Sequence, residues 1–98
     1  MEKLEIRGSE LLINCDLLPY IARDFEAKCK ALLALDSPEI TLDLSGVREI
    51  GSMFVAALVQ TCVAATSSGK KVTLRVPAKL QSYFDFADAD PYITVETV

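Results

Sequence analysis

The sequence predicts a single α/β domain, residues 1–98, with a mixed β-sheet and helices packed mainly on one face of that sheet. Short apolar runs of strand length alternate with longer stretches in which apolar residues recur every three or four positions. The resulting order of elements is ββαβαβαβ, and strands joined through helices are expected to pair by right-handed crossovers. The length of 98 residues fits one domain, and a hydrophobic content of 51% is sufficient for one core.

Two short strands and an amphipathic helix are expected in the first third of the chain. Residues 3–7 and 10–14 are strand-like runs separated by a Gly-Ser pair, which is typical of a hairpin or of two edge strands. Pro19 suits the first turn of a helix. After it, apolar residues recur at helical spacing and charged residues occupy the other faces. Pro38 cannot continue this helix and marks its end.

The remainder of the chain predicts a strand, a long helix, a strand, a short helix and a last strand. Their expected ranges are residues 39–44, residues 52–67 or 52–68, residues 71–76, residues 80–87 and residues 92–95. Gly69 is expected to stop the long helix. The predicted apolar stripe of that helix consists of Val55, Leu58, Val59, Cys62 and Val63. Because alanines cover much of the rest, the helix either packs on more than one side or offers apolar surface to a partner.

Composition excludes several classes of function. The net charge is −4 and the basic residues are scattered, so the chain shows no electrostatic footprint for nucleic acid. It contains no histidine, the commonest general base and metal ligand. Asp16 and Asp43 lie on or beside strands without a partner that spacing can identify. Since no nucleophile–base pair or metal-ligand spacing occurs, we expect no enzymatic activity, no metal and no cofactor.

The cysteine pattern and the apolar runs predict the compartment. Cys15, Cys29 and Cys62 show no paired spacing, and we expect free, mostly buried thiols in a reducing cytosol. The N-terminal residues do not resemble a signal peptide. The most apolar run, residues 53–65, is shorter than the roughly 20 residues that span a bilayer. The sequence therefore predicts a cytoplasmic protein without membrane insertion, either a monomer or a weak dimer.

The segment from Ile40 to Leu58 carries the most informative pattern. It reads as a buried strand, a loop containing Gly46 and a long apolar helix that begins near Ser52. A helix start has unpaired N–H groups and a positive dipole end. Ser52 is therefore either an N-cap, the commoner use of such a serine, or a place where a partner or a phosphate acts. Met53 and Phe54 are either core residues or an exposed contact.

This segment resembles the STAS domains of bacterial anti-sigma-factor antagonists. The resemblance extends from Glu10 to Val95. It is most specific at Leu42-Asp43-Leu44-Ser45-Gly46-Val47, followed by Ile50 and by Ala56-Ala57-Leu58. It implies a STAS-like fold and a non-catalytic interaction domain in signal transduction and transcription regulation. The partner would bind at the loop and at the N-terminus of the long helix, on Gly51, Ser52, Met53 and Phe54, which we call the junction.

The junction departs from the family's phosphorylation switch. Switch-type members resembling this chain carry Asp-Ser-Ser-Gly-Leu there, and a partner kinase phosphorylates the second serine. Here the aligned residues are Gly51, Ser52, Met53, Phe54 and Val55. A methionine cannot accept a phosphate, and Phe54 would crowd a partner that expects glycine. The resemblance thus implies partner binding without the usual switch, with Ser52 as the remaining candidate for phosphorylation.

Three classes of role follow from the resemblance. The partner is either an anti-sigma factor of the serine-kinase type or the ATPase of a lipid-transport ABC system. Some similar STAS proteins are accessory subunits of such an ATPase and keep one Ser or Thr at the junction. The third alternative is a degenerate scaffold domain in which Ser52 is only a helix cap.

Overall fold

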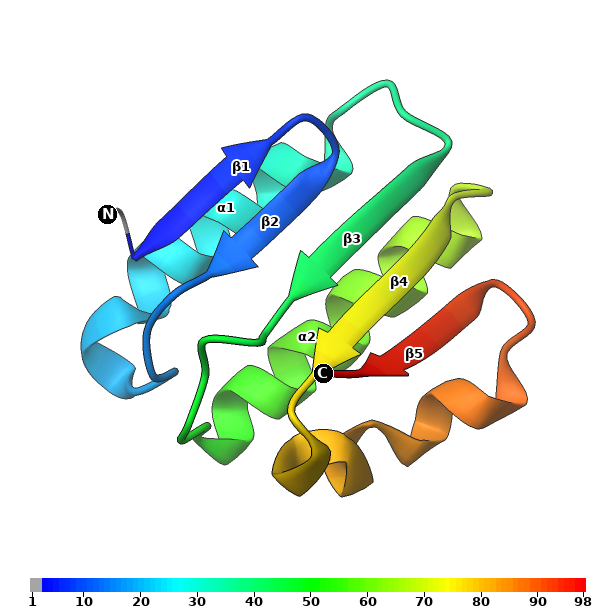
Figure 1. Ribbon diagram of the computed structural model, residues 1–98. Coiled ribbons are helices and arrows are strands. Elements are labelled where there is room, and N and C mark those ends of the chain that lie inside the picture. Colours follow the sequence, from blue (N-terminus) through cyan, green and yellow to red (C-terminus); the bar gives the residue numbers. More distant parts are fainter. Residues whose placement is uncertain (1–2) are drawn as a thin grey trace.

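The five strands lie in the sheet in the same order as in the sequence, β1-β2-β3-β4-β5 (Figure 1). The computed structural model describes residues 3–98, so the first two residues of the predicted domain lie outside the described residues. The strands are β1 (Leu4–Arg7), β2 (Glu10–Ile13), β3 (Glu39–Asp43), β4 (Lys71–Val76) and β5 (Ile93–Thr97). The helical segments are η1 (Pro19–Ile21), α1 (Ala22–Leu33), α2 (Ser52–Ser67) and η2 (Ala78–Ala89).

Strand direction explains why the helices share one face. β1 and β2 form an antiparallel hairpin, while β2, β3, β4 and β5 pair in parallel. The chain always steps in the same direction across the sheet, and crossovers of one hand then place every connecting helix on the same side. Figure 1 shows α1 and α2 behind the sheet. The predicted fold class, a mixed sheet with helices mainly on one face, is confirmed.

The other face of the sheet is open and polar. Along β4, Val72, Leu74 and Val76 are buried, whereas the alternate residues are at least partly exposed. Among these, the Arg75 guanidinium lies 2.9 Å from a carboxylate oxygen of Glu10 and 3.1 Å from one of Glu96. Parallel strands are usually covered on both faces. Here charged and polar side chains allow the uncovered face to contact water.

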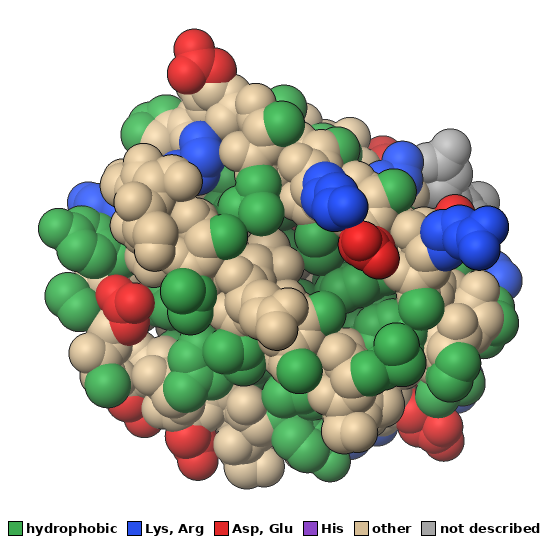
Figure 2. Space-filling view, turned by 180° about the vertical axis from the view of Figure 1, so that it is seen from behind, with side chains coloured by type: hydrophobic (Ala, Val, Ile, Leu, Met, Phe, Trp, Pro, Cys, Tyr) green, Lys and Arg blue, Asp and Glu red, His purple; other side chains and the backbone are tan. Residues whose placement is uncertain are grey.

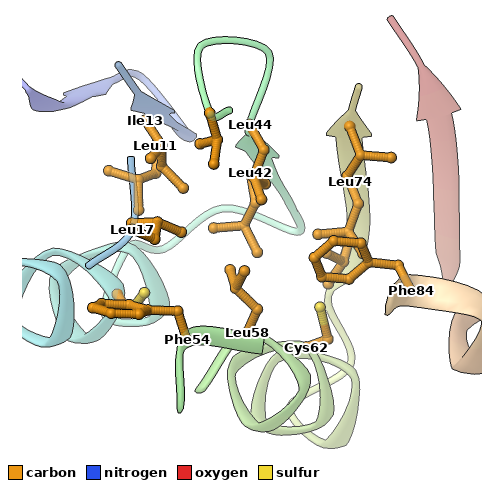
Figure 3. Packing of buried hydrophobic residues seen from close by; sticks show 14 of the residues in the cluster. Leu11, Ile13, Leu17, Leu42, Leu44, Phe54, Leu58, Cys62, Leu74 and Phe84 are labelled. Atoms are coloured by element: carbon orange, nitrogen blue, oxygen red, sulfur yellow. The ribbon is translucent and has the colours of Figure 1, made fainter. Parts of the chain in front are cut away.

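The core lies between the sheet and the helices. In Figure 3, Leu42 of β3, Leu44 directly after β3 and Leu74 of β4 point from the sheet toward α2. Leu58 and Cys62 point back toward them from α2, and all five side chains are fully buried. Burying a leucine of this kind contributes about 1.5–3 kcal/mol. This layer fixes the position of α2, and with it the position of the junction.

Two elements differ from their predicted form. The predicted short helix over residues 80–87 is η2, a longer segment of 3-10 turns with a kink at Phe84 (φ −116°, ψ 20°). The last strand begins at Ile93 and reaches Thr97, later than predicted. Gly69 follows α2 with φ +82°, as expected for a residue that ends a helix.

The predicted apolar stripe of α2 is confirmed at Leu58 and Cys62 and wrong at its three valines. The residues that α2 buries are Phe54, Leu58, Thr61, Cys62 and Ala65. Val63 is instead 54% exposed, and Val55 and Val59 are half-buried. Apolar residues surround this helix, so its sequence does not fix which side faces the sheet. Thr61 is tolerated inside because its hydroxyl donates a hydrogen bond to the Ala57 carbonyl (2.8 Å).

Candidate functional site

Two loops meet where α2 begins. They are the β2–α1 loop (residues 14–18) and the β3–α2 loop (residues 44–51). Leu17 and Ile50 form an isolated parallel bridge between them. The Leu17 N–H donates to the Glu49 carbonyl (2.9 Å), and the Gly51 N–H donates to the Leu17 carbonyl (2.9 Å). The buried Leu17 side chain anchors this bridge in the core.

Close packing of the two loops explains the glycine of the Leu-Asp-Leu-Ser-Gly-Val motif. A Cβ atom on Gly46 would lie 3.0 Å from the Ile13 carbonyl oxygen and 3.1 Å from the Asn14 Cα. Both neighbours are backbone atoms at the end of β2, which cannot move as a flexible side chain can. Glycine therefore favours this close approach, because a Cβ would force these backbone atoms to move by a few tenths of an ångström.

Asp16 holds the β3–α2 loop through two backbone hydrogen bonds. Its Oδ1 accepts the N–H of Arg48 (2.9 Å) and that of Glu49 (3.2 Å). The Arg48 guanidinium lies 3.7 Å from Oδ2. These hydrogen bonds, the one from Arg48 first, lower the pKa of the Asp16 carboxyl. Sequence reasoning missed this role, because the bonded residues are 32 and 33 positions away and leave no local signal.

The residue that caps α2 is Gly51. It has extended backbone (φ −75°, ψ 151°), and its carbonyl accepts the N–H groups of Phe54 (3.0 Å) and Val55 (3.3 Å). No side chain makes a capping hydrogen bond at this end of α2. Ser52 is the first helical residue and is exposed. The interpretation of Ser52 as an N-cap is therefore wrong.

Met53 and Phe54 face opposite environments. Met53 is 55% exposed, whereas Phe54 is 1% exposed. The Phe54 ring meets the Phe25 ring of α1 edge to face, with centroids 5.4 Å apart and an interplanar angle of 79°. The expectation that Phe54 would crowd a partner is wrong, because its ring points into the core (Figure 3). Of these two apolar side chains, only Met53 is available for contact.

A groove between α1 and α2 begins beside Met53. Its volume is about 440 Å³, and its apolar walls include Phe25, Cys29 and Leu33 of α1 and Ala57 of α2. The exposed ion pair between Glu26 and Lys30 (3.1 Å) also borders it. Figure 2 views this helical side of the molecule and shows apolar side chains gathered over it.

The outward surface of α2 continues this apolar character. The helix has 16 residues and contains no Asp, Glu, Lys or Arg. Met53, Ala56, Val63 and Ala64 are exposed along it. Of the two predicted roles for such a helix, the structure therefore favours apolar surface that is free for a partner.

Two of the three thiols lie in the core. All three cysteines are free; Cys29 and Cys62 are buried and Cys15 is half-buried. Burial raises the pKa of the Cys29 thiol to about 11 and that of Cys62 to about 12. Since the thiolate is the nucleophile, both thiols are inert near neutral pH.

Comparison with known proteins identifies the family. The model of the family described as MlaB, STAS domain, matches residues 4–93. The chain belongs to the STAS domain family. The resemblance that the sequence suggested is confirmed, and it assigns a regulatory protein-interaction role. No curated protein matches the chain.

A solved structure supports the STAS fold. It is a Thermotoga maritima protein assigned as an anti-sigma factor antagonist, with a TM-score of 0.72 and 21% sequence identity. The match covers 97% of this chain and 85% of that protein. STAS domains of this type are generally non-catalytic. Across residues 3–98, no helix of this STAS domain has the length and apolar character needed to cross a membrane.

Proposed function

We propose that this STAS domain is a non-catalytic regulator that binds a protein partner through the junction and the adjoining outward face of α2. The strongest support comes from α2, which exposes large apolar side chains and carries no charged residue. Met53 and Val63 are 55% and 54% exposed on a helix without charged residues. Methionine is enriched at interfaces, and apolar side chains that gather on an exposed face often mark binding sites. Phe54 supports the surface from beneath.

The proposed binding does not use the ordinary phosphorylation switch, since Met53 occupies the acceptor position. Ser52 is the one hydroxyl at the junction, and its side chain is exposed. A phosphate there would add about −1.5 to −2 charges at the positive end of α2, which the helix tolerates. The same charge would repel an acidic partner surface. Incubation with a co-purified serine kinase followed by mass spectrometry tests this mode, and an unmodified Ser52 would reject it.

The first candidate partner is an anti-sigma factor of the serine-kinase type, as the family resemblance implies. The second is the ATPase of a lipid-transport ABC system, for which the STAS domain would be an accessory subunit. A single hydroxyl residue at the junction, with methionine after it, favours the second candidate. The MlaB description of the matching family also fits it.

Affinity purification from the native cell distinguishes these candidates. The tagged wild-type chain is compared with Met53→Lys, which places a charge in the proposed contact, and with Met53→Ser, which restores an acceptor. We expect Met53→Lys to lose the partner while the fold is retained, because Met53 is largely exposed. Recovery of an ATPase supports the transport role, and recovery of a kinase supports the sigma-regulatory role. A partner that binds wild type and Met53→Lys equally would contradict the proposed surface.

A further inference from the structure

The junction is connected to the β2–α1 loop by a continuous set of hydrogen bonds. Asp16 accepts the Arg48 and Glu49 N–H groups, and the neighbouring Leu17 exchanges backbone hydrogen bonds with Glu49 and Gly51. In the last of these bonds the donor is the N–H of Gly51, whose carbonyl accepts the first hydrogen bonds of α2. The course of the chain into Ser52 is therefore set by contacts from another loop.

We propose that Asp16 is a positioning residue for the junction. Its carboxylate fixes residues 48 and 49, so that Leu17 can hold Gly51 and α2 presents Ser52 and Met53 in one orientation. This inference rests on the proposed function, because it concerns the geometry of the same surface. It adds that the geometry of this surface depends on a residue of a different loop, which is separated from Arg48 by 32 positions in the sequence.

The physical reason lies in the composition of the β3–α2 loop. Arg48 and Glu49 are exposed, so burial does not hold this part of the loop in place. The Asp16 side chain is only 19% exposed and carries a full charge, because hydrogen bonds from the backbone lower its pKa. Hydrogen bonds to a charged acceptor are stronger than those between neutral groups. One carboxylate therefore orders two adjacent peptide groups just before α2.

Lys70 offers a matched control at the other end of the sheet. Its ammonium group donates to the Leu35 carbonyl (2.7 Å) and to the Ser37 carbonyl (2.6 Å). It thus makes two side-chain-to-backbone bonds, as Asp16 does, but before β3 rather than after it (Figure 1). A variant that lacks this contact measures the effect of losing such a clamp far from the junction.

The test compares wild type, Asp16→Ala, Asp16→Asn and Lys70→Met by amide hydrogen exchange and ¹H–¹⁵N spectra of the full chain. In Asp16→Ala we expect exchange at Arg48 and Glu49 to accelerate by about tenfold or more. The deciding readouts are the Gly51 amide, whose acceptor is Leu17 rather than Asp16, and the Ser52 and Met53 resonances. We expect all three to change in Asp16→Ala and to remain unchanged in Lys70→Met.

Each outcome decides the proposal without knowledge of the partner. If exchange accelerates only at Arg48 and Glu49 while Gly51, Ser52 and Met53 stay as in wild type, Asp16 is a local hydrogen-bond acceptor and the proposal is overturned. If Asp16→Ala does not fold, Asp16→Asn is read by the same signals; its amide replaces the charged acceptor by a neutral one, so we expect smaller changes in the same direction. Binding to the partner recovered with wild type is then measured for Asp16→Ala and Lys70→Met. Loss of junction order without loss of binding would contradict the proposed binding surface and leave the positioning role intact.

Discussion

The two α-helices, α1 and α2, pack against the same face of the sheet but present different surfaces to solvent. α1 carries charged residues on its outward side, among them Arg23, Asp24 and Glu26, while α2 carries none. Their inward sides are alike: each buries a phenylalanine and a cysteine. Folding therefore needs the same inward chemistry from both helices. The main difference in charge lies on the outward sides, where it is free to serve binding.

The largest expected effect concerns the similar buried sides of α1 and α2, at the contact between Phe25 and Phe54. Replacing either ring by alanine should lower the free energy of unfolding by about 3–5 kcal/mol, because each is almost fully buried. In a double-mutant cycle the edge-to-face pair should contribute a coupling of about 0.5–1.5 kcal/mol. Urea unfolding measures both quantities. Tyr83→Ala, at a residue that is 51% exposed, is the control, with an expected change within about 0.5 kcal/mol.

If Phe54→Ala lowered the free energy of unfolding only slightly, Phe54 would not be a core residue. The distinction between a buried Phe54 and an exposed Met53 would then be wrong. If the alanine variants do not fold, Phe25→Leu and Phe54→Leu allow the same comparison with a smaller loss of unfolding free energy. If the double variant lost only the sum of the two single losses in unfolding free energy, the coupling would be zero and the two rings would not interact.

An intermediate effect is expected at alkaline pH, from the thiols that the two helices bury. The unfolded chain ionises its thiols near their ordinary pKa of 9.0, whereas in the fold the pKa of Cys29 is raised to about 11 and that of Cys62 to about 12. Their contribution to stability is therefore complete below pH 9 and is lost as the pH rises toward these folded values. Unfolding free energies measured from pH 8 to 11 should fall more steeply for wild type than for Cys29→Ala/Cys62→Ala.

Only the difference between the two slopes reports on the thiols, since every other titratable group is common to both proteins. Parallel slopes would show that these cysteines are exposed to solvent, and that the inward faces of α1 and α2 are looser than described.

The smallest effect on stability tests the outward difference directly. Ala31 on α1 and Ala56 on α2 are both exposed, so lysine at either position should change the free energy of unfolding by no more than about 0.5 kcal/mol. Ala56→Lys should nevertheless weaken binding of the partner recovered with wild type, because it places a charge on the uncharged face. Ala31→Lys should leave binding unchanged. If Ala56→Lys and Ala31→Lys bound the partner equally well, the uncharged face of α2 would not be the binding surface.

Much of the fold was predictable because it follows from local patterns. Alternation along residues 71–76 predicted β4 with its observed bounds, and the helical spacing after Pro19 predicted α1. Gly69 ended α2 as expected. The family resemblance was also readable, since the Leu-Asp-Leu-Ser-Gly-Val motif lies in one continuous segment.

The location of the candidate site remains a prediction from the sequence, and several of its details were open until the structure was seen. The sequence pointed to Gly51–Phe54, but it left open whether Met53 and Phe54 were core or contact. It also included in the buried stripe of α2 three valines that the structure leaves at least partly exposed, since a helix that is apolar on all sides carries no signal for its rotation. Asp16 had no visible role, because its bonds connect residues that are distant in sequence.

By itself the sequence determined the order of the elements, the uncharged character of α2 and the loss of the second serine at Met53. These properties depend on residue identity and on spacing within a few turns or strands. Only the tertiary structure decided that Gly51 caps α2, that Phe54 packs on Phe25 and that Asp16 accepts hydrogen bonds from the loop before the junction. The reason is physical: burial and hydrogen-bond partners across loops are set by which surfaces meet, and that depends on the packing of the whole chain.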